Sequence, residues 1–210
     1  MIVETAIIQS HLPCHDCGSS DALSLYADHS YCFSCKTKKP IKYGLDADPT
    51  LKNDTVFTLP PNTSYISWRG VTADTMRFYD VPFDGTRFYF NFGSRYISRE
   101  LGIKKFSSHG NSSDIQLFGQ RKFPKGSAGA ITICEGALDA MSFFQISGSK
   151  YPCVSVRSAS TAKTDCEISR NYLNSFSKIY IMFDNDNPGK EAVKEVSRLF
   201  DVNRVYNVEF

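Results

Sequence analysis

Short apolar runs alternate with segments of helical periodicity over residues 127–210. Four runs of strand length consist mainly of apolar residues, at 130–134, 153–156, 179–183 and 205–208. The segments between them that are predicted as helices are 137–145, 165–174 and 190–200. Strands without a polar face that alternate with helices predict a parallel sheet covered by helices. This part of the chain is therefore predicted to be an α/β domain.

The pattern is weaker over residues 64–126, where it predicts a small α+β lobe. A short helix is expected over residues 72–79, because the sequence Thr-Ala-Asp is a plausible helix start. Residues 87–92 alternate loosely and predict a strand. The Gly-Ser pair at 93–94 is interpreted as a turn into a second strand over residues 95–101.

Two Cys-x-x-Cys pairs stand near the N-terminus, Cys14 with Cys17 and Cys32 with Cys35, with 14 residues between them. Each pair forms a turn that points two thiolates at one position, and two such turns complete a tetrahedron. About forty residues bury too little apolar surface to fold alone, so bound metal supplies the missing free energy. The spacing predicts a Zn²⁺ ribbon. Redox pairs occur singly near a βαβ unit, which disfavours that alternative.

A hairpin is expected between the two cysteine pairs, with its turn near Asp28 and His29. Aromatic and polar side chains on such a ribbon either contact nucleic-acid bases or pack a minimal core. Asp28 and His29 are therefore candidate base-contacting residues, with core packing as the alternative. The stretch after the ribbon is rich in Pro, Asp and Asn, which predicts a linker.

The composition is that of a globular protein, with 210 residues, of which 41% are hydrophobic and 22% charged. No apolar run approaches the ~20 residues that a membrane span needs. The N-terminus lacks the basic start and apolar core of a signal peptide. We therefore expect a cytoplasmic protein without a membrane partner, whose seven cysteines do not form disulfides.

Charge is distributed unevenly along the chain, although the net charge is only +2. Residues 66–126 carry ten Lys and Arg against five Asp and Glu, whereas residues 127–210 carry nine against ten. This distribution suits a protein that holds a polyanion and a metal ion. Arg99, Lys104 and Lys105 stand among aromatic residues, a mixture that suits a sugar-phosphate backbone, with a solvated basic face as the alternative.

Carboxylates follow two of the predicted strands at their carboxyl ends. Glu135 comes directly after the first strand, Asp139 follows one helical turn later, and Asp184 and Asp186 follow the third strand. In a parallel sheet these strand ends meet at one edge, where the ligands of open α/β folds bind. Clustered carboxylates repel one another unless a divalent cation lies among them, so a Mg²⁺ site suited to phosphoryl transfer is predicted. A simple polar turn is the alternative for Asp184 and Asp186.

The motif EGALDA at 135–140, followed by FDNDNPGKEA at 183–192, resembles the TOPRIM domain of DnaG-type primases, topoisomerases and some nucleases. With the Cys₄ ribbon, HLPCHDCGSS at 11–20 and RGVTADT at 69–75, the whole chain resembles the primase half of the bifunctional primase-helicases of T-seven-type podoviruses. The resemblance implies a zinc-ribbon template-recognition domain, a flexible linker, a basic N-terminal lobe of the polymerase domain and a TOPRIM domain, at residues 1–39, 40–63, 64–126 and 127–210.

The resemblance also implies an activity and its residues. The activity is the synthesis of short RNA primers on single-stranded DNA, from ribonucleoside triphosphates, for phage DNA replication. The implied ligands of Mg²⁺ or Mn²⁺ are Glu135, Asp184 and Asp186, with Asp139 assisting, and those of zinc are Cys14, Cys17, Cys32 and Cys35. The residues implied to hold nucleotide or template are Arg99, Lys104, Lys105 and Lys190. A replicative helicase, fused or separate, and a replicative DNA polymerase are the implied partners in the infected bacterial host.

The chain departs from this family's pattern in two places. It stops at Phe210, before a further acidic motif and a helicase domain, and it has no GxxxxGK[ST] motif, so no helicase activity is expected of it. The family's Gly-rich loop after the second strand is replaced by the sequence Arg-Ser-Ala-Ser at 157–160. The alternative functions are a TOPRIM nuclease or topoisomerase-like enzyme, and a non-catalytic replisome protein that binds single-stranded DNA.

Overall fold

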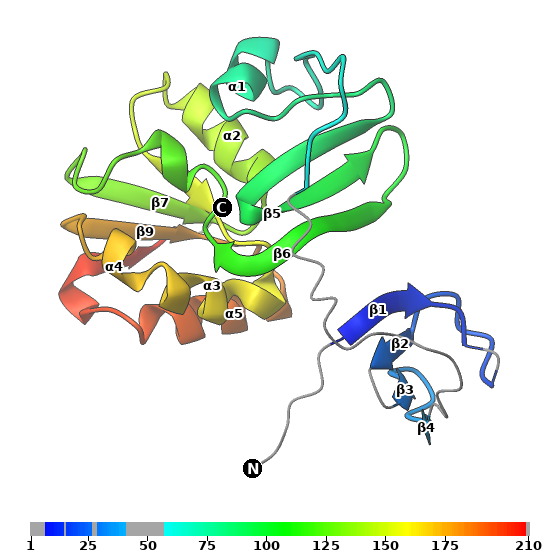
Figure 1. Ribbon diagram of the computed structural model, residues 1–210. Helices are drawn as coiled ribbons and strands as arrows, with labels where there is room; N and C mark the ends of the chain where they lie inside the picture. Colours follow the sequence, from blue (N-terminus) through cyan, green and yellow to red (C-terminus); the bar gives the residue numbers. More distant parts are fainter. Residues whose placement is uncertain (1–6, 15, 27–28, 41–56, 209–210) are drawn as a thin grey trace. The chain divides into compact units, whose positions relative to one another are not determined.

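The computed structural model describes residues 7–208 except residues 15, 27–28 and 41–56. The chain divides into two compact units, Met1–Lys52 and Asn53–Phe210 (Figure 1). Most of the predicted linker lies outside the described residues, as does Asp28.

The first unit is a small antiparallel sheet. Its strands are β1 (Ile7–Leu12), β2 (Leu23–Tyr26), β3 (His29–Cys32) and β4 (Lys38–Pro40), paired in that order. The pairing of β2 with β3 confirms the hairpin that was expected between the cysteine pairs. Among the described residues of this unit, the buried hydrophobic side chains are those of Cys14 and Cys32. The unit therefore has almost no apolar core apart from its cysteines.

The second unit is built on a parallel sheet with the order β10-β9-β7-β8. Its strands are β7 (Ala130–Cys134), β8 (Cys153–Ser155), β9 (Lys178–Met182) and β10 (Val205–Asn207). All four strands were predicted, and their bounds agree to within one residue. They could be predicted because strands that are covered on both faces consist of continuous apolar runs.

Helices cover both faces of this sheet (Figure 1). The helix α2 (Ala137–Ile146) lies on one face beside α1 (Ala73–Phe78), and α3, α4 and α5 lie on the other. The bounds of these three and of the short 3₁₀ turns are α3 Ala162–Ile168, α4 Arg170–Leu173, α5 Asn187–Ser197, η1 Gln120–Lys122, η2 Ala159–Thr161 and η3 Val202–Arg204. The helix α1 begins where it was expected, since the Thr72 hydroxyl accepts a hydrogen bond from the Thr75 N–H at 3.3 Å.

The prediction of a turn at Gly93 and Ser94 is wrong. The strand β5 (Arg87–Glu100) continues through these residues and pairs with β6 (Phe106–Ile115), and the register shifts at Gly93. Gly93 has a φ of +82° and forms a bulge rather than a hairpin turn. No strand was predicted at β6, because its sequence FSSHGNSSDI is small, polar and largely exposed.

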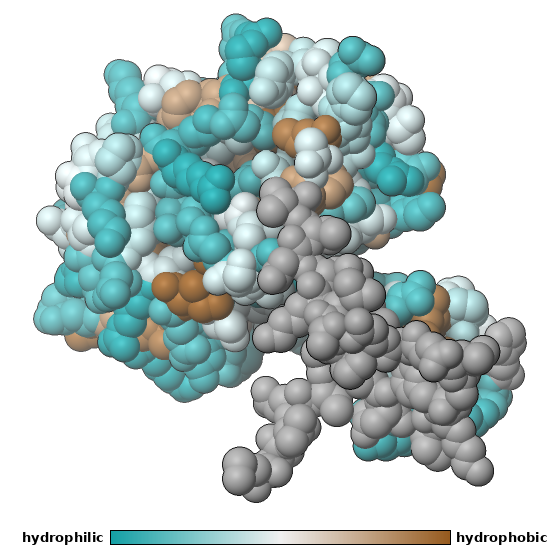
Figure 2. All heavy atoms as spheres, viewed as in Figure 1, coloured by the Kyte–Doolittle hydropathy of each residue, from teal (hydrophilic) through white to brown (hydrophobic). Residues whose placement is uncertain are grey.

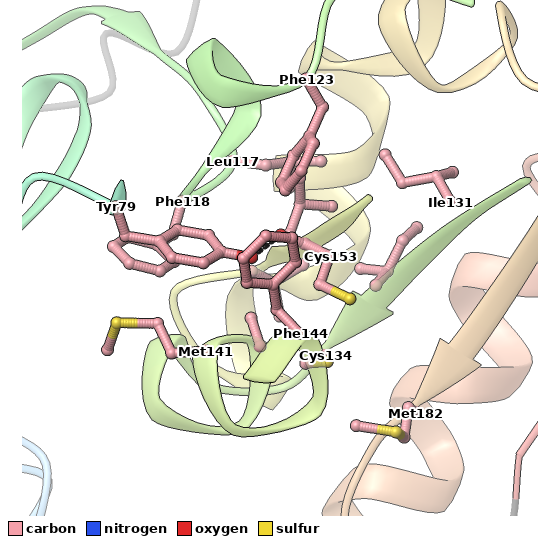
Figure 3. Packing of buried hydrophobic residues seen from close by; sticks show 14 of the residues in the cluster. Tyr79, Leu117, Phe118, Phe123, Ile131, Cys134, Met141, Phe144, Cys153 and Met182 are labelled. Atoms are coloured by element: carbon pink, nitrogen blue, oxygen red, sulfur yellow. Dashed lines mark hydrogen bonds between the residues drawn. The ribbon is translucent and has the colours of Figure 1, made fainter. Parts of the chain in front are cut away.

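One hydrophobic core joins residues 64–126 to the parallel sheet (Figure 3). Tyr79 stacks on Phe118 with ring centroids 5.2 Å apart, and its hydroxyl donates a hydrogen bond to the Cys153 carbonyl at 2.9 Å. Phe118 also forms a β-bridge with Ser155 at the end of β8. The predicted basic lobe and the sheet therefore pack as one body, which fixes the β5–β6 hairpin relative to the strand ends.

The surface of the second unit is mainly hydrophilic on the face drawn in Figure 2, where hydrophobic residues form small separate patches. None of the helices among the described residues combines the length and the apolar character that crossing a membrane would require. The large apolar side chains are mostly inside the core that Figure 3 shows.

We expect Gly93→Ala to destabilise the second unit more than Gly102→Ala, a matched control in the same hairpin. Both glycines have a positive φ, +82° and +84°, so both alanine variants lose about 1–2 kcal/mol through backbone strain. A Cβ at Gly93 would lie 2.0 Å from the Asp114 carbonyl oxygen, whereas none of the surrounding atoms lies within 4 Å at Gly102. Overpacking adds about 1–3 kcal/mol at Gly93. Chemical denaturation followed by circular dichroism measures both, and equal losses would contradict the bulge.

Candidate active site

The ends of two neighbouring strands bring the first carboxylates together. In the parallel pair β7–β9, Cys134 lies opposite Met182, so Glu135 and Asp184 leave the sheet at the same edge. The Asp184 N–H donates a hydrogen bond to Glu135 Oε2 at 3.2 Å. This is the meeting of strand ends that was expected from the alternation of strands and helices.

Asp186 and Asp139 stand at the starts of two helices beside this edge. Asp186 is the N-cap of α5, where its Oδ1 accepts a hydrogen bond from the Gly189 N–H at 2.8 Å. A Cβ at Gly189 would lie 2.1 Å from the Asp184 carbonyl oxygen, so glycine is needed for this close approach. Asp139 lies in the first turn of α2. One oxygen of Asp186 is therefore used by the helix cap, while Asp184 remains exposed.

The electrostatics of this edge indicate a missing positive charge. Burial raises the pKa of Glu135, and the charges of Asp184, Asp186 and Asp139 raise it further. Desolvation also raises the pKa of Asp139, helped by the charge of Asp184, although Arg69 acts in the opposite direction. Carboxylate oxygens are the donors that a hard divalent cation prefers. Among the described residues, however, no three of these carboxylates bring ligand oxygens within 4.8 Å of one another, as the four cysteines do with their sulfur atoms.

Glu135, Asp139 and Asp184, but not Asp186, line a cleft of about 740 Å³. Other lining residues come from the β5–β6 hairpin, from the segment before α1 and from the loop after β8. The charged residues that line the cleft are Glu135, Asp139, Asp184, Arg69, Arg99, Lys104 and Arg157. The aromatic residues that line it are Phe90, Phe92 and Phe106. A cleft lined by both carboxylates and cations has the charge pattern that suits a metal together with a polyphosphate.

Arg99 is held in the cleft by stacking. Its guanidinium carbon lies 4.9 Å from the ring centroid of Trp68 and 5.2 Å from that of Phe106. Its Nε is buried and has no hydrogen-bond partner among the described residues. Contact with the two rings thus restrains the guanidinium while leaving it at the cleft, where it can bind an anion.

The other predicted basic residues divide into two groups. Lys104 lines the cleft, whereas Lys105 and Lys190 are not among its lining residues. Lys105 pairs with Glu100 at 3.7 Å, and Lys190 is exposed on α5. Two lining residues, Arg69 and Arg157, were not among the predicted site residues. The only signal for them was the basic charge of residues 66–126 and the unusual Arg-Ser-Ala-Ser loop.

The four cysteines of the first unit form a second candidate centre. Their sulfur atoms all lie within 4.8 Å of one another, with 3.9 Å between Cys14 and Cys35 and 3.7 Å between Cys17 and Cys32. Hydrogen bonding by Thr37 lowers the pKa of Cys35 to about 6, which favours its thiolate. Four converging thiols, of which that of Cys35 ionises readily, suit a tetrahedral metal site. Nearby, the His29 ring stacks on that of Tyr26 with centroids 4.4 Å apart.

Three comparisons place these features among known proteins. Residues 132–209 match the family model described as Toprim-like. A DNA helicase/primase of Enterobacteria phage T3 is 27% identical over 227 residues, which cover 96% of this chain and 39% of that protein. The chain therefore spans about two fifths of the length of this relative.

Two solved structures are also similar. The crystal structure of the primase fragment of bacteriophage T7 primase-helicase is 25% identical, with a TM-score of 0.66, over 97% of this chain and 90% of that one. A structure of bacteriophage T7 lagging-strand DNA polymerase, interacting with primase domains bound to an RNA/DNA hybrid, matches with 25% identity and a TM-score of 0.62. That match covers 71% of this chain and 81% of the other. The chain thus contains a Toprim-like domain and is similar, over nearly its whole length, to the primase part of T7-like primase-helicases.

Proposed function

We propose that this chain is a DNA-directed RNA primase, a nucleotidyltransferase that makes short RNA primers on single-stranded DNA. The observation that carries the proposal is the cleft, which Glu135, Asp139 and Asp184 line together with Arg99 and Lys104. The similarity to primase chains supports the same reaction class. The attacking 3′-hydroxyl and the α-phosphate of the next ribonucleotide react in this cleft, and pyrophosphate leaves.

Glu135, Asp184 and Asp186 hold the divalent cation in this proposal, and Asp139 assists them. Mg²⁺ or Mn²⁺ supplies, when bound, the positive charge that steadies the phosphates and the attacking oxygen. Because the pKa of Glu135 is raised, its carboxyl stays protonated to a higher pH than an ordinary glutamate. Where it is protonated, cation binding displaces the proton. The carboxylates thus exchange mutual repulsion for attraction to the bound metal, which in turn attracts the nucleotide phosphates.

The basic residues that line the cleft are proposed to bind the phosphate charges that the metal does not neutralise. Arg99 and Lys104 contact nucleotide phosphates or the template backbone inside the cleft, where they line its wall. Lys105 and Lys190 lie outside the set of lining residues, so a role for them is limited to template outside the cleft. Single-stranded DNA and ribonucleoside triphosphates are the substrates.

The first unit is proposed to be a zinc ribbon that helps to select the template sequence. A Zn²⁺ ion about 2.3 Å from four thiolates places the sulfurs about 3.8 Å apart. The Cys14–Cys35 and Cys17–Cys32 separations of 3.9 and 3.7 Å agree with this geometry. His29, stacked on Tyr26, and Asp28 are proposed to contact template bases. Elemental analysis that finds no zinc in the purified chain would contradict the ribbon assignment.

Proteins of phage replication are the proposed partners, and the host cytoplasm is the proposed location. The curated relative is named as a helicase and primase, and the second T7 structure is described as a polymerase with primase domains. A replicative helicase and a replicative DNA polymerase are accordingly proposed as partners of this chain.

Primer synthesis on single-stranded DNA tests the proposal. Wild-type chain with labelled ribonucleotides and Mg²⁺ is expected to give short oligoribonucleotides, and Glu135→Gln to lower their rate at least ~100-fold. Single-stranded DNA binding should remain nearly unchanged, since Glu135 holds metal rather than template. Glu167→Gln removes an exposed carboxylate on α3 and serves as the control. Nicked DNA without any RNA product from wild type would sink the primase assignment.

Glu135→Gln is also expected to change how stability depends on pH. Burial and neighbouring carboxylates raise the folded-state pKa of Glu135, so the folded chain binds this proton more tightly than the unfolded chain. The contribution of Glu135 to stability is therefore lost as pH rises from the ordinary glutamate pKa through the raised one. The glutamine variant lacks this contribution, so its stability is expected to fall less than that of wild type over this range. Chemical denaturation at several pH values without added Mg²⁺ measures the difference. The Glu167→Gln control should keep the wild-type slope, and an unchanged slope in Glu135→Gln would rule out Glu135 as the source of the decline.

A further inference from the structure

Arg157 is a cation of the cleft that the proposed function leaves without a role. It follows β8, which lies beside β7, and it lines the cleft together with Glu135, Asp139 and Asp184. Its side chain is only 15% exposed. A nearly buried arginine that reaches a cleft costs desolvation unless its charge is matched there.

Asp165 on α3 holds Arg157 in one orientation. Arg157 Nε donates to Asp165 Oδ1 at 3.0 Å and to Oδ2 at 3.2 Å, and Nη2 donates to Oδ1 at 2.6 Å. Asp165 is 2% exposed and also accepts hydrogen bonds from the Arg157 N–H at 2.9 Å and the Thr161 hydroxyl at 3.0 Å. The Asp165 oxygens are thus fully used, while Nη1 of Arg157 takes part in none of these bonds.

A second arginine makes the charge of this group positive. Burial lowers the pKa of Arg95, and the charge of Arg157 lowers it further, whereas the charge of Asp165 raises it. Arg95 Nη2 donates to the Ser112 hydroxyl at 2.6 Å, and its Nε is buried with no hydrogen-bond partner among the described residues. Two guanidinium groups against one carboxylate leave these three residues with one net positive charge, and of the three only Arg157 lines the cleft.

We propose that Arg157 binds the polyphosphate chain of the incoming nucleoside triphosphate, and that Asp165 is the positioning residue that orients it. The inference rests on the proposed function and assigns one more residue to its nucleotide site. A guanidinium fixed on its Nε edge presents its remaining N–H groups as a rigid donor to phosphate oxygens. The carboxylates that share the cleft are the proposed ligands of the cation that accompanies such a polyphosphate.

Anion binding without added metal tests the arginine separately from catalysis. Inorganic tripolyphosphate is titrated into the full chain by calorimetry in the absence of added divalent cation. Arg157→Ala would leave Asp165 buried and unpaired, so the test uses Arg157→Gln with Asp165→Asn, and separately Arg157→Lys, which keeps the pair charged. The double variant is expected to bind tripolyphosphate at least ~10-fold more weakly. The affinity of the lysine variant should lie between those of the double variant and wild type, because lysine keeps the charge but lacks the planar set of guanidinium donors.

An exposed arginine provides the matched control. Arg170→Gln removes the same charge on α4, outside the residues that line the cleft, and should leave tripolyphosphate affinity close to wild type. Wild-type affinity in a folded double variant, as judged by circular dichroism, would overturn the inference, and so would wild-type affinity in Arg157→Lys.

Primer kinetics separate this inference from the proposed function. If both hold, the double variant raises the KM for ribonucleoside triphosphate about 10-fold, with single-stranded DNA binding unchanged. If wild type and the double variant both make primers, with equal KM for ribonucleoside triphosphate, the role of Arg157 is refuted and the primase assignment stays intact. Absence of primers from wild type, together with Arg157-dependent tripolyphosphate binding, would refute the primase assignment and support the anion site.

Discussion

Repulsion among carboxylates at one edge of a parallel sheet is the constraint on which the rest of the site depends. The register of β7 and β9 places Glu135 beside Asp184, and the starts of α2 and α5 add Asp139 and Asp186. The apolar strands of the sheet fix where the backbone leaves it at Glu135 and Asp184. Burial and the neighbouring negative charges raise the pKa values of Glu135 and Asp139, and the proposed divalent cation offsets those charges.

One core joins the β5–β6 hairpin, which lines part of the cleft, to the parallel sheet. Because Tyr79 and Phe118 pack against the end of β8, the β5–β6 hairpin is held against the sheet rather than tethered to it. Two arginines that line the cleft, Arg99 and Arg157, are held by different contacts. Arg99 contacts two aromatic rings, and Arg157 is held by a buried carboxylate. Donors that are fixed before the ligand arrives need little reorganisation during the reaction.

The sequence allowed the parallel sheet and its acidic edge to be predicted, because apolar runs and strand order are local properties. The strand β6 could not be predicted, since its small polar residues gain their pairing only from β5 across the bulge at Gly93. Arg157 shows the same limit within the site. Its position depends on Asp165, eight residues further along the chain, and its access to the cleft depends on the fold of the hairpin.

The central claim is that the acidic edge binds a divalent cation together with a nucleotide. Mn²⁺ binding followed by electron paramagnetic resonance tests it most directly, in wild type and Asp184→Asn, with and without a non-hydrolysable ribonucleoside triphosphate analogue. The account predicts that wild type binds Mn²⁺, that the analogue tightens this binding, and that Asp184→Asn loses both effects. Equal Mn²⁺ binding by the two proteins, unaffected by the analogue, would contradict it.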